Sequence, residues 1–135
     1  MIKLVILGQT PSKKNSPRIL YRWKRGVRGK PFVAPSKISA AWATTAILQL
    51  KTQRPPGPPI DSEIILDAQI YRWGRRKADL SNLIQSIEDA LQAAEIIKDD
   101  FLINGYGDSQ RFLGCPKGEE RAEIKIYRKG GEDEK

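Results

Sequence analysis

The feature that most constrains the fold of this 135-residue chain is an amphipathic segment in its second half. Apolar residues recur there at helical spacing. Their positions are Leu80, Ile84, Ile87, Leu91 and Ala94. Leu83 and Ala90 widen the same face, and such a helix buries its apolar face against the rest of the domain. Asp79 or Ser81 is expected to cap its start. The segment therefore predicts a helix over residues 80–94.

Short apolar or alternating runs, separated by turn signals, surround this helix and are typical of strands. They span residues 3–8, 18–24, 31–34, 60–73, 102–112 and 122–129. Ser36 is expected to cap an earlier helix that ends near Gln53. The proline-rich residues 54–59 favour a stiff loop inside one domain. We therefore predict an α+β fold with two main helices and a small mixed β-sheet of five or six strands. The domain spans residues 1–129, and residues 130–135 form a polar tail that we expect to be disordered.

Positive charge is concentrated in the first part of the chain. The formal net charge is +8, yet the first 60 residues contain twelve Lys and Arg and no Asp or Glu. This pattern favours binding to the phosphate groups of DNA or RNA, with a solvated basic surface as the alternative. Basic turns are predicted at residues 25–30 and, further along, at residues 74–78. The predicted nucleic-acid contacts are Lys13, Lys14, Arg18, Lys24, Arg25, Arg28, Lys30, Arg75 and Arg76.

The chain contains no histidine and a single cysteine, Cys115. This composition excludes an intrachain disulfide, Cys/His zinc sites, Ser-His-Asp triads and Cys-His dyads. No run approaches the ~20 apolar residues of a membrane span, and the N-terminus does not resemble a signal peptide. We therefore expect no membrane partner and no small-molecule cofactor. Its chemistry would depend on carboxylates, hydroxyls, basic side chains and a hard metal ion.

Acidic residues stand at both ends of the predicted helix. Asp79 precedes it, and Asp99 and Asp100 follow it. Mg²⁺ typically binds one or two carboxylates together with water and substrate phosphate. Asn82 lies one turn after Asp79 and could orient that carboxylate, whereas Asp89 is a weaker candidate. Each of these residues also has an ordinary structural interpretation as a cap, a solvated turn or a local hydrogen-bonding group.

The two acidic groups are far apart along the helix. A ~16-residue helix is ~24 Å long. Asp79 can therefore meet Asp99 and Asp100 only if the chain doubles back or if a second subunit supplies one of the two groups.

Three separated motifs resemble the RusA family of Holliday junction resolvases. They are K-A-D-L-S-N-L at residues 77–83, D-A-L at 89–91 and D-D at 99–100. The family signature has a basic turn, D-x-D-N-L, D-A-L on the helix and D-D just beyond it. The segments G-Q-T-P-S-K-K-N and P-F-V-A-P-S-K, before the first helix, are also similar to the family. The resemblance covers roughly residues 3–128.

The resemblance implies a small homodimer, encoded by a bacterium or prophage, that acts in the cytoplasm, which agrees with the single cysteine. It implies binding to four-way junction DNA and symmetric cutting of two strands in recombination and repair, with 5′-phosphate and 3′-hydroxyl ends. It also implies Mg²⁺, with Mn²⁺ as a substitute, held by Asp79, Asp99 and Asp100 as the catalytic and metal-binding residues. The supporting residues are Lys77, Ser81, Asn82 and Asp89.

Two positions depart from the family pattern. Ser81 replaces the second aspartate of D-x-D-N, and Gln85 stands where some members have lysine. The serine motivates a second hypothesis, a non-catalytic junction-binding protein on the same fold. A third hypothesis is a basic single-strand-binding or RNA-binding module. It is motivated by Tyr21, Trp23 and Phe32, because aromatic rings between cations can stack on bases.

Overall fold

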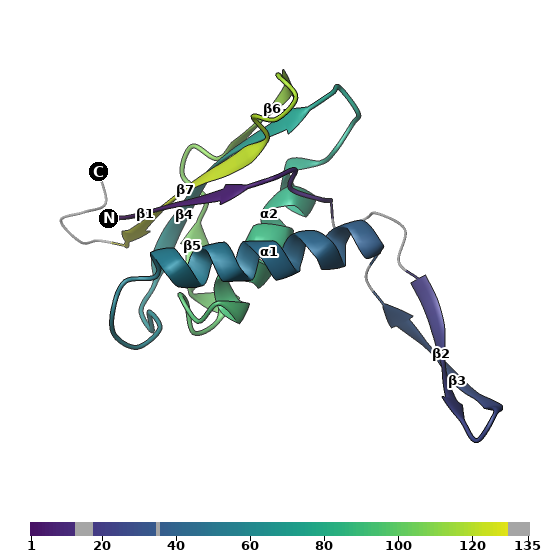
Figure 1. Cartoon of the computed structure of the whole chain (residues 1–135). Helices are drawn as coiled ribbons and strands as arrows, with labels where there is room; N and C mark the ends of the chain where they lie inside the picture. The colour runs from purple at the N-terminus through teal and green to yellow at the C-terminus, as the bar shows by residue number, and fades with distance from the viewer. Residues whose placement is uncertain (13–17, 35, 130–135) are drawn as a thin grey trace.

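A sheet with two helices packed against it forms the body of the domain in the computed structural model, which describes residues 1–12, 18–34 and 36–129 (Figure 1). In chain order the elements are β1 (Ile2–Leu7), β2 (Arg18–Lys24), β3 (Val27–Ala34), α1 (Lys37–Gln53), β4 (Ile64–Trp73), α2 (Leu80–Ala93), the 3₁₀ turn η1 (Asp100–Leu102), β5 (Ile103–Gly105), β6 (Gln110–Cys115) and β7 (Arg121–Arg128). The predicted α+β class is confirmed. The tail at 130–135 and the predicted DNA contacts Lys13 and Lys14 lie outside the described residues.

Strand β4 lies at the centre of the sheet. β7 pairs with it in the antiparallel direction, and β1 pairs antiparallel with β7 at the edge. On its other side, β4 pairs in parallel with β5 and with β6. The sheet is therefore mixed and five-stranded, as predicted. β2 and β3 form a separate antiparallel hairpin, which extends away from the helices and the sheet (Figure 1).

Alternation along β4 separates a buried face from a half-buried one. Every second residue from Ile64 to Ile70 is fully buried, as expected when side chains point alternately to the two faces of a strand. This row packs with apolar side chains of both helices and of the neighbouring strands. They include Leu83, Ile87 and Leu91 from α2, Trp42, Ala46 and Leu50 from α1, and Ile6 and Ile124 from β1 and β7. The amphipathic helix predicted from the sequence thus contributes its apolar face to the core. Within the described residues, no helix is long and apolar enough to cross a membrane.

Both helices begin where the sequence predicts. The Ser36 hydroxyl oxygen accepts a hydrogen bond from the Ser39 amide at 3.1 Å, which confirms the predicted cap of α1. Asp79 occupies the cap position of α2.

The predicted strand at residues 102–112 is wrong in one respect, because it consists of two short strands, β5 and β6. A turn separates them, in which the Ser109 amide donates to the Tyr106 carbonyl oxygen at 3.0 Å. Gly107 within this turn has a φ of 53°, a conformation that favours glycine. The local reversal was hidden in the sequence by the apolar residues on both sides of it.

The predicted basic turn at residues 25–30 is also shorter than expected. Arg25 and Gly26 alone form it, with positive φ values of 53° and 75°. Two-residue hairpin turns with positive φ at both positions match the right-handed twist of the flanking strands. β3 therefore begins at Val27 rather than at Pro31. The described residues contain seven strands, five in the main sheet and two in the hairpin.

Side chains of α1 occupy part of the free edge of β1. The Val5 amide donates to Gln53 Oε1 at 2.8 Å, and Gln53 Nε2 donates to the Val5 carbonyl oxygen at 2.7 Å. Gln49 forms the same pair of bonds with the backbone of Leu7, at 2.8 and 3.2 Å. These two glutamines therefore bond to the edge strand as a neighbouring strand would.

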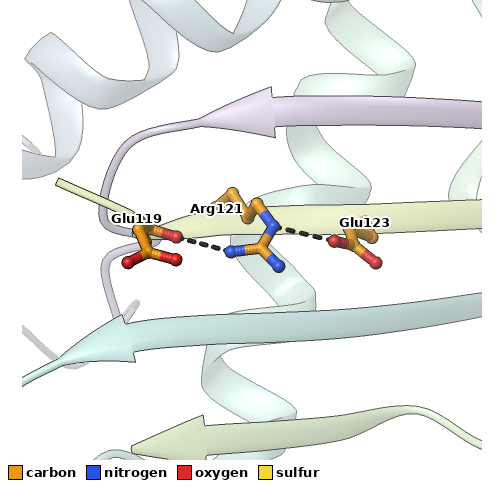
Figure 2. Close-up of polar contacts among 3 residues, drawn as sticks. All are labelled: Glu119, Arg121 and Glu123. Carbon is orange, nitrogen blue, oxygen red and sulfur yellow. Dashed lines mark hydrogen bonds and ion pairs between the residues drawn. The ribbon is translucent and has the colours of Figure 1, made fainter. Parts of the chain in front are cut away.

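A row of side chains crosses the outer face of the sheet. Tyr71 on β4 stacks on Phe112 with ring centroids 4.8 Å apart, and the Arg121 guanidinium lies 4.1 Å from the Tyr71 ring centroid. Figure 2 shows that Arg121 also forms polar contacts with Glu119 and Glu123, which lie close to it in the sequence. Its Nε donates to the Glu123 carboxylate at 2.7 Å, and its Nη1 donates to the Glu119 carbonyl oxygen at 2.8 Å. The charge of Arg121 is thus balanced inside the domain.

Candidate active site and nucleic-acid interface

Asp79 lies exposed at the N-terminus of α2, but its carboxylate does not cap the helix. The Asp79 backbone carbonyl accepts from the Asn82 and Leu83 amides at 3.1 and 3.2 Å, and the side chain makes no capping hydrogen bond. The Asn82 side-chain amide lies 3.5 Å from Asp79 Oδ2 and is placed to orient it. The ordinary interpretation of Asp79 as a side-chain cap is therefore not supported. This carboxylate remains available for a ligand.

Asp99 and Asp100 lie together beyond the other end of α2. Asp99 accepts a hydrogen bond from the Phe101 amide at 2.9 Å, and the Asp100 amide donates to Gln92 Oε1 at 3.0 Å. The Phe101 amide, together with a hydrogen bond from Asp100, lowers the pKa of Asp99. The hydrogen bond to Asp99 is the largest of the effects that raise the pKa of Asp100. Two neighbouring carboxyl groups that compete for one proton offer a local concentration of negative charge to a cation.

The structure does not bring these two acidic groups together within one chain. α2 contains 14 residues, which corresponds to about 21 Å of helix. In the part of the chain that is described, no three Asp, Glu, Cys or His side chains lie close enough to hold one metal ion. A single chain therefore offers two separate carboxylate sites, Asp79 and the Asp99–Asp100 pair.

A groove of about 500 Å³ runs beside α2 and is lined by residues from Leu80 to Glu88. Ser81, Asn82 and Gln85 line it near Asp79, and Glu88 and Tyr106 line it further along. Two of the predicted supporting residues, Ser81 and Asn82, thus belong to the same surface as a glutamate that the sequence analysis missed. The signal for Glu88 was its position seven residues after Ser81, which places both side chains on one helix face.

Glu88 has an unusual environment in this groove. Its Oε1 accepts a hydrogen bond from the Tyr106 hydroxyl at 2.6 Å. Burial raises the pKa of Glu88, and the charges of Asp100 and Asp89 raise it further, against the Tyr106 bond. The bond to Glu88 also raises the pKa of Tyr106 to about 12. The predicted residue Asp89 is exposed and contributes to this acidic surface by its charge.

The raised pKa of Glu88 predicts a pH-dependent effect of Glu88→Gln. A carboxyl group whose pKa is raised by folding stabilises the protein most below its unfolded pKa, and this contribution is lost as pH rises through the folded pKa. Glutamine cannot ionise and can still accept the Tyr106 bond. The melting temperature of Glu88→Gln relative to wild type should therefore increase from pH 4 to pH 7. Glu95→Gln is the matched control, and an equal increase in that variant would contradict the assignment to Glu88.

The predicted basic contacts fall into two groups. Arg75, Arg76 and Lys77 are exposed in the turn that leads directly to Asp79. The others that can be placed are on the β2–β3 hairpin, where Lys24, Arg25, Arg28 and Lys30 are exposed and Arg18 begins β2.

Aromatic rings accompany the cations of the hairpin. The Arg28 guanidinium lies 4.5 Å from the Tyr21 ring centroid, and that of Arg22 lies 5.4 Å from the Phe32 centroid. Trp23 is 65% exposed. Cationic and aromatic groups on one exposed hairpin are suited to contact with phosphates and bases.

Comparison with known proteins places these features in a family context. No protein-family model matches the chain. Over 105 residues, the chain is 34% identical to the crossover junction endodeoxyribonuclease RusA of Aquifex aeolicus (strain VF5). The alignment covers 78% of this chain and 79% of that protein, so the similarity extends over most of both.

Proposed function

This chain belongs to the RusA family of crossover junction endodeoxyribonucleases, and we propose that it is an endonuclease that resolves four-way (Holliday) DNA junctions by paired, symmetric nicks. The observation that carries this proposal is the position of Asp79. Its carboxylate is not used to cap α2, and only Ala78 separates it in the chain from the cations Arg75, Arg76 and Lys77. A carboxylate beside a group of cations is suited to chemistry on a bound phosphodiester.

The proposed cofactor is Mg²⁺, for which Mn²⁺ can substitute. The residues that would hold it are Asp79, Asp99 and Asp100, and they fit a hard ion because all of them donate oxygen. When bound, the ion would activate a water molecule and offset the negative charge that develops on the phosphodiester. Asn82 would orient the Asp79 carboxylate, and the Ser81 hydroxyl would contact the ion or one of its waters. The expected products carry 5′-phosphate and 3′-hydroxyl ends.

We further propose that the active protein is a homodimer with composite sites. The Asp99–Asp100 pair of one protomer would join Asp79 of its partner, because each chain alone holds these groups at opposite ends of α2. A symmetric dimer presents two identical sites, which suits paired cuts in a two-fold symmetric junction.

The first experiment is a gel assay with a mobile four-way junction and a linear duplex of matched sequence, each with Mg²⁺, Mn²⁺ or EDTA. Paired nicks in the junction alone, and only with metal, are the expected result. Cleavage of both substrates at equal rates would contradict junction specificity. Efficient displacement of the junction by single-stranded DNA or RNA at moderate salt would favour a single-strand-binding module instead.

A second candidate function is junction capture without cleavage, and Ser81 is the observation that favours it. A neutral hydroxyl is a weaker ligand for Mg²⁺ than the carboxylate of the family motif. Under this candidate function, wild type binds junctions without cutting them, and Ser81→Asp produces metal-dependent nicking. Ser81→Ala provides the control at the same exposed helix position. If wild type only binds and Ser81→Asp gives no cleavage, the serine is not what prevents catalysis.

A further inference from the structure

The buried row of β4 ends in a charged residue. Ile64, Leu66, Ala68 and Ile70 face the core, and the next position with the same orientation is Arg72, which is only 8% exposed. A charged side chain in this position is costly unless a partner compensates for the lost hydration. Arg72 is not among the residues predicted from the sequence, although the alternating pattern of β4 places it among apolar residues.

Arg72 has little internal compensation for its charge. Its Nε donates to the Thr10 carbonyl oxygen at 3.2 Å, and no carboxylate of the described residues forms an ion pair with it. Burial lowers the pKa of the Arg72 guanidinium, and the charge of Arg76 lowers it further. Arg121, one strand away, differs because Glu123 balances it (Figure 2). The remaining guanidinium donors of Arg72 are therefore suited to an external anion.

A cavity of about 300 Å³ adjoins Arg72 and is lined by further cations. Arg75, Arg76 and Lys77 contribute to its wall, as do Gln9 and residues 11–12 of the preceding loop. Like charges brought together in this way repel each other unless an anion lies between them.

Hydrogen bonds hold the wall of this cavity in place. The Trp73 amide donates to Gln9 Oε1 at 2.9 Å, and Gln9 Nε2 donates to the Trp73 carbonyl oxygen at 3.2 Å. The Ser86 hydroxyl donates to the Pro11 carbonyl oxygen at 2.8 Å, which ties the loop to α2. The cavity is therefore formed before any ligand arrives, so little ordering entropy opposes binding.

We propose that this cavity binds one phosphate group of the DNA backbone, with Arg72 as its buried contact and Arg76 and Lys77 at its mouth. The choice of DNA as the source of the phosphate rests on the proposed function. Because Lys77 and Ala78 line the cavity and Asp79 is the next residue in the chain, a phosphate held here fixes the strand relative to the Asp79 carboxylate. Arg72 is thus a positioning residue for the strand.

The test compares Arg72→Met with wild type in junction binding across a series of salt concentrations. Methionine keeps an unbranched side chain in the core-facing row and removes the charge. Loss of one phosphate contact should reduce the slope of log K against log salt by about 0.9. Loss of hydrogen bonds to a charged group should weaken binding by about tenfold or more. Arg72→Lys should recover part of both effects, and Lys51→Met, at the far end of α1, should change neither.

A second measurement uses inorganic phosphate without DNA. At constant ionic strength, phosphate in place of chloride should raise the melting temperature of wild type by about 2–5 °C. The increase should be absent in Arg72→Met and reduced in Arg76→Gln, whose side chain is exposed. If Arg72→Met does not fold, Arg76→Gln decides the matter: an unchanged phosphate response in that variant overturns the proposal.

The combined results separate this proposal from the proposed function. A folded Arg72→Met with an unchanged salt slope overturns the DNA-phosphate assignment, even if inorganic phosphate still stabilises wild type, because the cavity would then bind free phosphate alone. A reduced salt slope supports the assignment even if the protein cuts no junction, because the slope measures DNA binding without any cleavage.

Discussion

Replacing Asp79 by asparagine is expected to reduce the rate of junction cleavage by at least about a hundredfold. Mutation of a residue that only orients a metal ligand typically lowers activity by about 10–100-fold, and loss of a ligand itself should cost at least as much. Asparagine keeps the size and the contact with Asn82 but removes the negative charge that would bind Mg²⁺. Junction affinity should stay equal or rise, because one charge that repels phosphate is lost. Single-turnover cleavage and gel-shift titrations in the same buffer measure the two quantities.

The control for this prediction is Asp61→Asn, which removes an exposed carboxylate that pairs with Lys98 on the surface. It should leave the cleavage rate unchanged. If Asp79→Asn weakened cleavage and junction binding in equal proportion, with its fold intact, Asp79 would be a binding residue rather than a catalytic one.

Mixing two inactive variants tests whether the sites are shared between protomers. Asp79→Asn and Asp100→Asn should each abolish cleavage alone. In a mixed dimer, one chain carries Asp79→Asn and the other carries Asp100→Asn. If each site combines Asp79 of one chain with Asp100 of the other, one site contains both substitutions and the second site contains neither. Mixed dimers should therefore produce single nicks without paired cuts. A complete lack of recovery after subunit exchange would show that each site belongs to one chain.

The second large effect is expected from reversing two charges at the hairpin tip, with Arg25→Glu and Arg28→Glu combined. Each lost phosphate contact lowers the salt slope by about 0.9, so the double variant should lose about 1.8. Affinity for the junction at moderate salt should fall by at least about tenfold. Thermal stability should change little, because the hairpin extends away from the core and both side chains are exposed (Figure 1).

A control with the same change in net charge distinguishes a specific contact from a general field. Lys51→Glu combined with Lys125→Glu reverses two exposed cations on α1 and β7. This variant should keep most of its salt slope. Equal losses in the two double variants would mean that the hairpin acts only through the total charge of the protein.

The sequence predicted the core better than the site. The spacing of Leu83, Ile87 and Leu91 depends on helix geometry alone, and the alternation of Ile64 and Leu66 depends on strand geometry alone, so both could be interpreted locally. The turn between β5 and β6 was missed because the apolar residues on both sides of Gly107 make the whole run resemble one strand. The two-residue hairpin turn requires a positive φ at both Arg25 and Gly26. Glycine adopts a positive φ readily, so Gly26 indicates the turn, whereas an arginine gives no such indication.

The candidate site depends on contacts between distant residues, which the sequence does not reveal. Whether the Asp79 side chain caps α2 depends on its orientation in the folded chain, and the motif D-x-S-N is compatible with either outcome. The bond between Glu88 and Tyr106 joins α2 to a turn that the sequence did not predict. Arg72 was the exception, because its place in the alternating pattern of β4 could have identified it as a buried charge.

The two glutamines on the edge of β1 limit how copies of this protein can associate. An edge strand with free amide and carbonyl groups is a template to which another chain can add a strand. At Val5 and Leu7 these groups are already bonded to Gln53 and Gln49. A second copy therefore cannot extend the sheet there without first displacing four hydrogen bonds. Any contact that another chain makes with this edge at Val5 and Leu7 must therefore use side chains rather than backbone pairing.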